Sequence, residues 1–225
     1  KGDFTFSRST AATRVNASGN IEKETGNLLL QSNQFLTGWT NYLSNETSGQ
    51  VGYDGSNDAW LLTKTGASGH IAQAVSQSGV NTFSVYVKAG TLNWVRLIDI
   101  GGGNRERYFD LQNGVLGGSS YTSEIDSKIQ SIGNGWYRCS ITTNISFTQV
   151  RIYPAQGNFD TTGTSGNIYI QDAQLEAGLV ATDYIETGAS TAQAGILEDM
   201  PRLDYSGSCP ALLLEPQRTN QCSYS

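Results

Sequence analysis

Four runs of the sequence alternate apolar side chains with aromatic or arginine side chains, at 82–90, 93–99, 134–142 and 149–154. Because side chains on a strand alternate between its two faces, the run 93–99 turns Val95 and Leu97 to one face and Trp94 and Arg96 to the other. An aromatic ring can cover the apolar face of a sugar while guanidinium groups donate hydrogen bonds to its hydroxyls. The pattern therefore predicts a carbohydrate-binding platform, with Trp94 as the stacking ring, made of Trp94, Arg96, Arg138, Arg151 and Tyr153.

A purely structural role fits the same side chains. Trp94 and Tyr153 can cover the second layer of a sandwich while the arginines reach water at its edge. Arg138 can also pair with a carboxylate such as Asp99 or Asp110. Both interpretations place the opposite, apolar face of the runs in the core. That face carries Phe83, Val85, Val87, Val95, Leu97, Val150 and Ile152.

Catalytic chemistry finds less support in the residues. A glycosidase needs two carboxylates that face each other across a cleft, and none of the 20 acidic residues lies in a distinctive motif. His70 has no serine or cysteine nucleophile signature around it. We therefore predict no enzymatic activity and no cofactor. Asp172 and Glu176 could supply oxygens to a structural calcium site, although a solvated sheet edge explains them as well.

The elements that must position these residues are short strands. With 37% hydrophobic residues, 26 glycines and 4 prolines among 225 residues, the composition is typical of an all-β sandwich, and no stretch shows sustained helical periodicity. The alternating runs predict strands at 27–35, 59–65, 70–75, 82–89, 93–100, 107–111, 124–129, 136–143, 149–153 and 167–175. Two polar loops, 42–58 and 155–166, are the second candidate location for a site, because long loops are often functional.

Charge and hydropathy limit the classes of partner that the chain is expected to bind. The net charge is −6 and the basic residues are dispersed, which argues against nucleic acid. The longest apolar runs fall far short of the roughly 20 residues that cross a bilayer, so we expect no membrane insertion. The chain begins at Lys1 and its only methionine is Met200, so we expect a piece of a longer polypeptide.

Three segments are expected along the chain. Residues 1–27 form an extended arm or connector, residues 28–188 form the sandwich, and residues 189–225 form a linker and the start of a following repeat-like connector. The last expectation rests on a near-repetition of 14–33 by 202–217. The arm 1–27 contains a few apolar side chains, but it has no apolar face large enough to hold it to its own domain. We therefore expect packing on a partner chain and a homo-oligomer.

Five motifs together resemble a known family, at 27–35 followed by Trp39, 83–90, 108–111, 133–139 and 169–176. They are similar to the carbohydrate-binding-module-like jelly-roll domains of phage tail and other virion proteins. The resemblance implies a jelly-roll β-sandwich of the concanavalin or galactose-binding kind with extended N- and C-terminal flanks. It also implies non-catalytic attachment to a polysaccharide or oligosaccharide in an extracellular or virion setting, with a trimer favoured.

Two alternatives stay open. One is a structural or assembly module of a phage tail fibre that binds no glycan. The other is a polysaccharide-degrading enzyme.

Overall fold

The computed structural model describes residues 13–15, 21–23, 25–101, 104–120, 124–194, 203–204 and 211–212. The chain divides into two compact units, residues 26–192 and residues 1–25 with 193–225. In the second of these units, β1 (Thr13–Val15) pairs with β2 (Ile21–Lys23), and β17 (Leu203–Asp204) pairs with β18 (Ala211–Leu212). These hairpins fall on the two near-repeated segments, of which residues 16–20, 24, 202, 205–210 and 213–217 lie outside the described part of the chain.

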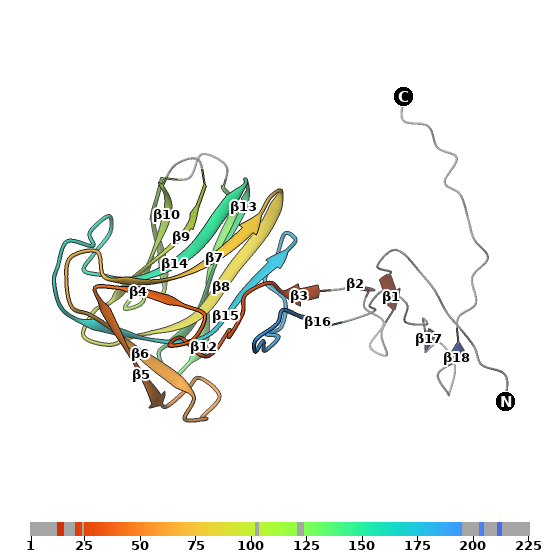
Figure 1. Ribbon diagram of the computed structural model, residues 1–225, viewed down its shortest axis with the longest axis horizontal. Helices are drawn as coiled ribbons and strands as arrows, with labels where there is room; N and C mark the ends of the chain where they lie inside the picture. Colours follow the sequence, from red (N-terminus) through yellow and green to blue (C-terminus); the bar gives the residue numbers. More distant parts are fainter. Residues whose placement is uncertain are drawn as a thin grey trace. The chain divides into compact units, whose positions relative to one another are not determined.

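The larger unit contains two six-stranded antiparallel sheets (Figure 1). The first sheet has the order β11 (Val115–Ser119), β10 (Asn104–Asp110), β9 (Trp94–Ile100), β14 (Phe147–Ala155), β7 (His70–Gln77) and β4 (Thr40–Tyr42). The second sheet has the order β12 (Glu124–Gly133), β13 (Trp136–Asn144), β8 (Val80–Ala89), β15 (Asn167–Ala177), β6 (Ala59–Lys64) and β5 (Ser44–Gln50). A separate two-stranded sheet pairs β3 (Thr25–Asn27) with β16 (Ala192–Ala194).

The strand order makes this sandwich a jelly roll. The chain crosses from β7 in the first sheet to β8 in the second and back to β9, and it later returns through β12, β13 and β14. On the way back β13 inserts between β8 and β12, and β14 inserts between β7 and β9. The predicted all-β jelly-roll class is confirmed, and the described residues include no helix, hence none that is long and apolar enough to cross a membrane.

The core lies between the two sheets, and alternation assigned its residues correctly. All seven side chains expected to point inward are buried in one apolar cluster, together with Cys139 and Ile141 of β13. The outer face of each sheet is the face turned away from this cluster. Trp94, Arg96 and Tyr153 lie on the outer face of the first sheet, because they alternate with the buried Val95, Leu97 and Ile152.

Two predicted elements are wrong. Residues 28–35 are not a strand, because the chain turns directly after β3 and polar side chains hold the turns. The buried Asn27 amide donates to the carbonyl oxygens of Ala173 and Ile185, at 3.0 and 2.9 Å. The segment 42–58 is not one long loop, because the strand β5 occupies residues 44–50. Its sequence, Ser-Asn-Glu-Thr-Ser-Gly-Gln, resembles a loop because this edge strand is largely solvated and polar.

Candidate functional site

A row of side chains crosses five strands on the outer face of the first sheet. Tyr42 of β4 lies directly opposite His70 of β7, and Arg96 of β9 lies opposite both Tyr153 of β14 and Tyr108 of β10. The His70 and Tyr153 rings stack with centroids 4.2 Å apart, and the Tyr42 ring lies 5.3 Å from His70. We call these five residues the aromatic row.

Arg96 is fixed in the middle of the row by protein groups. Its guanidinium lies over the Tyr153 ring, 4.3 Å from the centroid, and its Nε lies 2.9 Å from a carboxylate oxygen of Glu106. Its Nη1 also donates to the hydroxyl of Thr161 at 3.4 Å. These contacts direct the Arg96 donors toward the protein, so the side chain positions the row rather than offering a free hydrogen-bonding fork.

The loop 155–166, expected to be functional, is tied to the sandwich beside Arg96. The buried Lys64 ammonium donates to the carbonyl oxygen of Thr161 at 2.9 Å and to Oε1 of Gln156 at 3.2 Å. Burial lowers the pKa of Lys64. The two hydrogen bonds of Lys64 attach the loop to β6. Both acceptors are neutral, so they satisfy the buried ammonium without neutralising its charge.

An open groove of about 420 Å³ lies at the other end of the row, where β4, β7 and β14 meet. Tyr42 is 55% exposed there, whereas Tyr153 is only 3% exposed because its two faces are covered by His70 and Arg96. The ring that a ligand could cover is therefore that of Tyr42. The groove is lined by Thr40, Asn41, Tyr42, Ser68, His70, Ala72, Gln149, Arg151 and Tyr153.

Arg151 is held in this groove by two neutral acceptors. Its Nε donates to Oε1 of Gln149 at 2.6 Å, and its Nη1 donates to the hydroxyl of Tyr153 at 3.0 Å. Among the residues that the structure describes, no carboxylate lies within ion-pair distance of Arg151. Its Nη2 therefore remains available for a ligand.

His70 is uncharged at neutral pH. Burial, the largest cause, and the positive charges of Arg151 and Arg96 together lower the pKa of its imidazole to about 4, against the opposing hydrogen bond to Ser68. The Nδ1 atom lies 2.9 Å from the carbonyl oxygen of Ser68, which can only accept, so Nδ1 carries the proton. The second ring nitrogen, Nε2, is then an acceptor that a sugar hydroxyl can use.

Trp94, the expected stacking ring, lies outside the groove. A Cβ placed on Gly117 of β11 would come within 2.6 Å of Cζ3 of Trp94, so the indole packs directly over that glycine. The amide of Gly118 donates to Oδ1 of Asn158 at 2.6 Å and fixes the same corner. Trp94 is half-buried and covers the sheet end as the structural interpretation expected.

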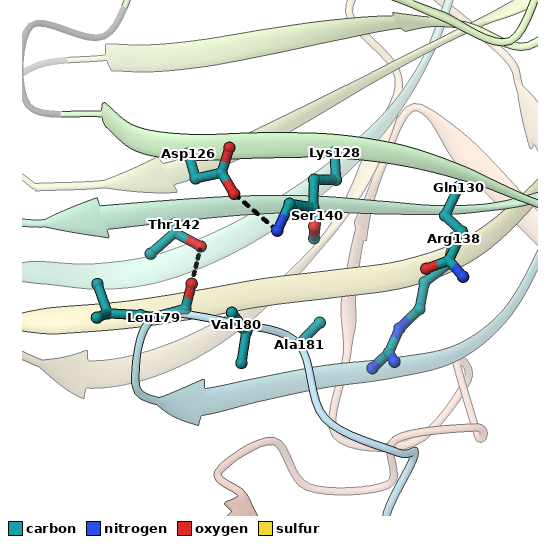
Figure 2. Close-up of a pocket in the computed structure, with 9 residues that line it drawn as sticks. All are labelled: Asp126, Lys128, Gln130, Arg138, Ser140, Thr142, Leu179, Val180 and Ala181. Carbon is teal, nitrogen blue, oxygen red and sulfur yellow. Dashed lines mark hydrogen bonds and ion pairs between the residues drawn. The ribbon is translucent and has the colours of Figure 1, made fainter.

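Arg138 lies on the other sheet, so the five expected residues do not share one face. Figure 2 shows Arg138 among the residues that line a hollow beside β13. Its guanidinium lies 5.3 Å from the centroid of the Tyr86 ring, and Nη2 donates to the hydroxyl of Ser84 at 3.1 Å. It lines a hollow of about 130 Å³ between β12, β13 and the segment 179–181. Alternation defines which side of its own strand a residue takes, but it leaves open which sheet the strand joins.

The residues expected to bind calcium belong to different hydrogen-bond clusters. Asp172 accepts a hydrogen bond from the Tyr53 hydroxyl at 2.8 Å, and burial raises the pKa of Asp172 to about 7. Glu176 accepts from Nε2 of Gln174 at 2.7 Å and from the amide of Thr182 at 3.0 Å. No group of three His, Cys, Asp or Glu side chains in the described ranges could hold a metal ion. Structural calcium therefore stays a prediction without such a group to support it.

Three groove residues were missed by sequence reasoning. Tyr42 falls at the start of a segment expected to be a loop, His70 has no nucleophile signature around it, and Gln149 carries no distinctive signal. The missing information is the pairing of β4 with β7, which sets Tyr42 opposite His70. A lone aromatic before a polar edge strand is the only signal that could have suggested it.

No model of a known protein family matches the chain, and no curated protein matches it. Solved structures similar to it include the enzymatically active domain of bacteriophage CBA120 tailspike protein 4, with a TM-score of 0.39, 15% identity and coverage of 66% of this chain. This chain spans 21% of the tailspike chain.

The CBM22-1 xylan-binding domain from Paenibacillus barcinonensis has a TM-score of 0.35 and 13% identity, over 70% of this chain and 94% of that one. A CBM61 module in complex with β-1,4-galactotriose has a TM-score of 0.35 and 15% identity, over 65% and 96% of the two chains. At these low TM-scores the likeness is distant, and the functional argument rests on the groove itself.

Proposed function

We propose that this protein is a non-catalytic carbohydrate-binding module whose ligand lies in the groove between β4, β7 and β14. One observation carries the proposal: the aromatic row ends in an exposed ring, Tyr42, beside a guanidinium with free donors, Arg151. The binding residues we propose are Tyr42, His70, Gln149 and Arg151, and Tyr153 positions Arg151 through its hydroxyl.

The groove supplies the two parts that sugar recognition needs. The Tyr42 ring offers an apolar surface for the C–H face of a pyranose. Around it, Nη2 of Arg151 can donate to ring hydroxyls and Nε2 of His70 can accept from them. A volume of about 420 Å³ falls in the ordinary range for small-ligand sites.

The lining also supports binding without hydrolysis. Carboxylate-pair hydrolysis needs an acid and a base or nucleophile on opposite sides of the scissile bond. The described residues that line the groove include no Asp or Glu. An assay for reducing ends released from plant, algal and bacterial polysaccharides tests this part of the proposal, and sustained release would contradict it.

A glycan array tests the function itself. We expect the full chain to bind a subset of glycans and Tyr42→Ala to lose that binding while its fold is unchanged. Tyr169→Ala is the matched control, because Tyr169 is a half-buried tyrosine of β15 in the second sheet. Binding that Tyr42→Ala leaves unchanged would place the site elsewhere. An array without any signal from a folded protein would favour the assembly module.

The cellular setting and the oligomeric state are part of the same proposal. The setting rests on the sequence resemblance, and the oligomeric state rests on that resemblance and on the apolar side chains of the arm 1–27. We propose an extracellular or virion location and a homo-oligomer, with a trimer favoured. Light scattering at micromolar concentration measures the second point directly. A mass of 24.2 kDa, that of one chain, would contradict it.

A further inference from the structure

The groove has an uncompensated positive charge. Arg151 is the one formally charged side chain among its described lining residues, since His70 is neutral at pH 7. Glu46 accepts hydrogen bonds from Ser44 at 2.8 Å and from the lining residue Asn41 at 3.3 Å, and it does not itself line the groove. The groove is therefore positive in a chain whose net charge is −6.

Two other arginines of the first sheet have carboxylate partners of their own. Arg96 of β9 pairs with Glu106 at 2.9 Å, and Arg107 of β10 pairs with Glu124. Arg151 has instead an amide oxygen and a phenol oxygen, which orient the guanidinium without neutralising it. A half-buried guanidinium held rigidly by neutral acceptors is prepared for an anion, because little side-chain entropy remains to be lost on binding.

We propose that the glycan taken by the groove is anionic and carries a carboxylate, as a uronic acid does. The carboxylate binds Nη2 of Arg151 and the second hydrogen of Nη1, whose first hydrogen is donated to Tyr153. This inference rests on the proposed function of the groove and specifies its ligand. The planar guanidinium matches the two oxygens of a carboxylate, and the pair forms charge-assisted hydrogen bonds. Because the lining offers a single positive charge, a monoanion fits it better than a phosphate monoester with nearly two negative charges.

The test is an array of uronic-acid oligosaccharides in which each member is paired with its carboxyl-reduced, neutral counterpart. We expect the carboxylated member of a pair to bind on the order of ten- to a hundredfold more tightly, the ratio that a hydrogen bond to a charged group supplies. Added salt should weaken the binding of the acidic member only. A third set of sulfated oligosaccharides separates a carboxylate from a sulfate ester as the source of the negative charge.

Arg151→Gln should abolish the preference for the acidic member. Lys128→Gln is the control for loss of one positive charge, because Lys128 is exposed on β12 of the other sheet and pairs only with Asp126 there. Equal or tighter binding of the neutral members, still sensitive to Tyr42→Ala, would overturn the anionic ligand and leave the proposed function standing. Binding of sulfated members alone would overturn the carboxylate. Binding of no member and of no neutral glycan would overturn both proposals.

Discussion

The rings of His70 and Tyr153 stack across β7 and β14 with their centroids 4.2 Å apart and their planes 22° apart. This stack closes one side of the groove and buries Tyr153, whose hydroxyl nevertheless reaches the Nη1 of Arg151 at 3.0 Å. Packing and ligand recognition are thus separated within one row. Buried rings hold the arginines in place, and the ring at the exposed end is free to meet a ligand.

Replacing Tyr153 should separate these roles. We expect Tyr153→Ala to lower the free energy of unfolding by about 3–5 kcal/mol, the range for truncating a buried aromatic. Tyr153→Phe removes only the hydroxyl that accepts from Arg151 and should cost about 0.5–1.5 kcal/mol. Urea unfolding of both variants measures the two values. Equal stability of the Ala variant and the unmodified protein would show that the ring does not support the row.

Trp94→Ala should affect the fold and not the ligand. The indole packs over Gly117 outside the groove, so we expect about 1–3 kcal/mol of lost stability and an unchanged glycan affinity. Thermal unfolding and a binding titration must be made on the same preparation. A selective loss of affinity would restore Trp94 as a stacking ring.

Gly117→Ala tests the same packing from the other side. The new Cβ would lie 2.6 Å from Cζ3 of Trp94 and 2.9 Å from Cβ of Tyr108, so one of these side chains must shift. We expect a loss of about 1–3 kcal/mol, typical of overpacking. In Trp94→Ala the indole contact is gone, so the added cost of Gly117→Ala should shrink. A double-mutant cycle that shows full additivity would argue against this contact.

Asp172 should make stability depend on pH. Its pKa is about 7 in the folded protein, mainly because of burial, against an ordinary value of 3.8. Between these values the folded state keeps a proton that the unfolded state has released, so the stabilising contribution present at low pH is lost as pH rises toward 7. Asp172→Asn cannot ionise, and asparagine tolerates the positive φ of 52° at this position. We expect the stability of the variant relative to the unmodified protein to improve from about pH 4 to about pH 7.

The pKa of His70 is shifted in the opposite direction to that of Asp172, so the pH dependence of a His70 variant is a control for that measurement. Its pKa is lowered to about 4 from an ordinary 6.5, so its contribution is present above the higher value and is lost as pH falls toward the lower one. His70→Gln should therefore lose less stability on acidification over this window than the unmodified protein does. If the stability of Asp172→Asn and of His70→Gln, each relative to the unmodified protein, changed with pH in the same direction, both pKa assignments would be contradicted.

Much of the sandwich could be predicted because burial imposes period-two alternation on strands that face a core. The sequences of β8, β9, β13 and β14 alternate closely, and the apolar side chains on one face of each strand point into the common core. Partner choice is different, because alternation within a strand says nothing about the strand beside it. Arg138 therefore takes the expected side of its strand but lies on the other sheet. The edge strands β4 and β5 were missed for a related reason: solvated edges need no apolar pattern, and Tyr42 lies on one of them.

A crystal structure of the full chain with the tightest-binding array glycan tests the central claim most directly. We expect a pyranose ring packed on the face of Tyr42, with an anionic group on the Nη1–Nη2 edge of Arg151 and a hydroxyl at Nε2 of His70. A glycan bound in the hollow beside Arg138, or against Trp94 at the far end of the first sheet, would contradict the assignment of the site.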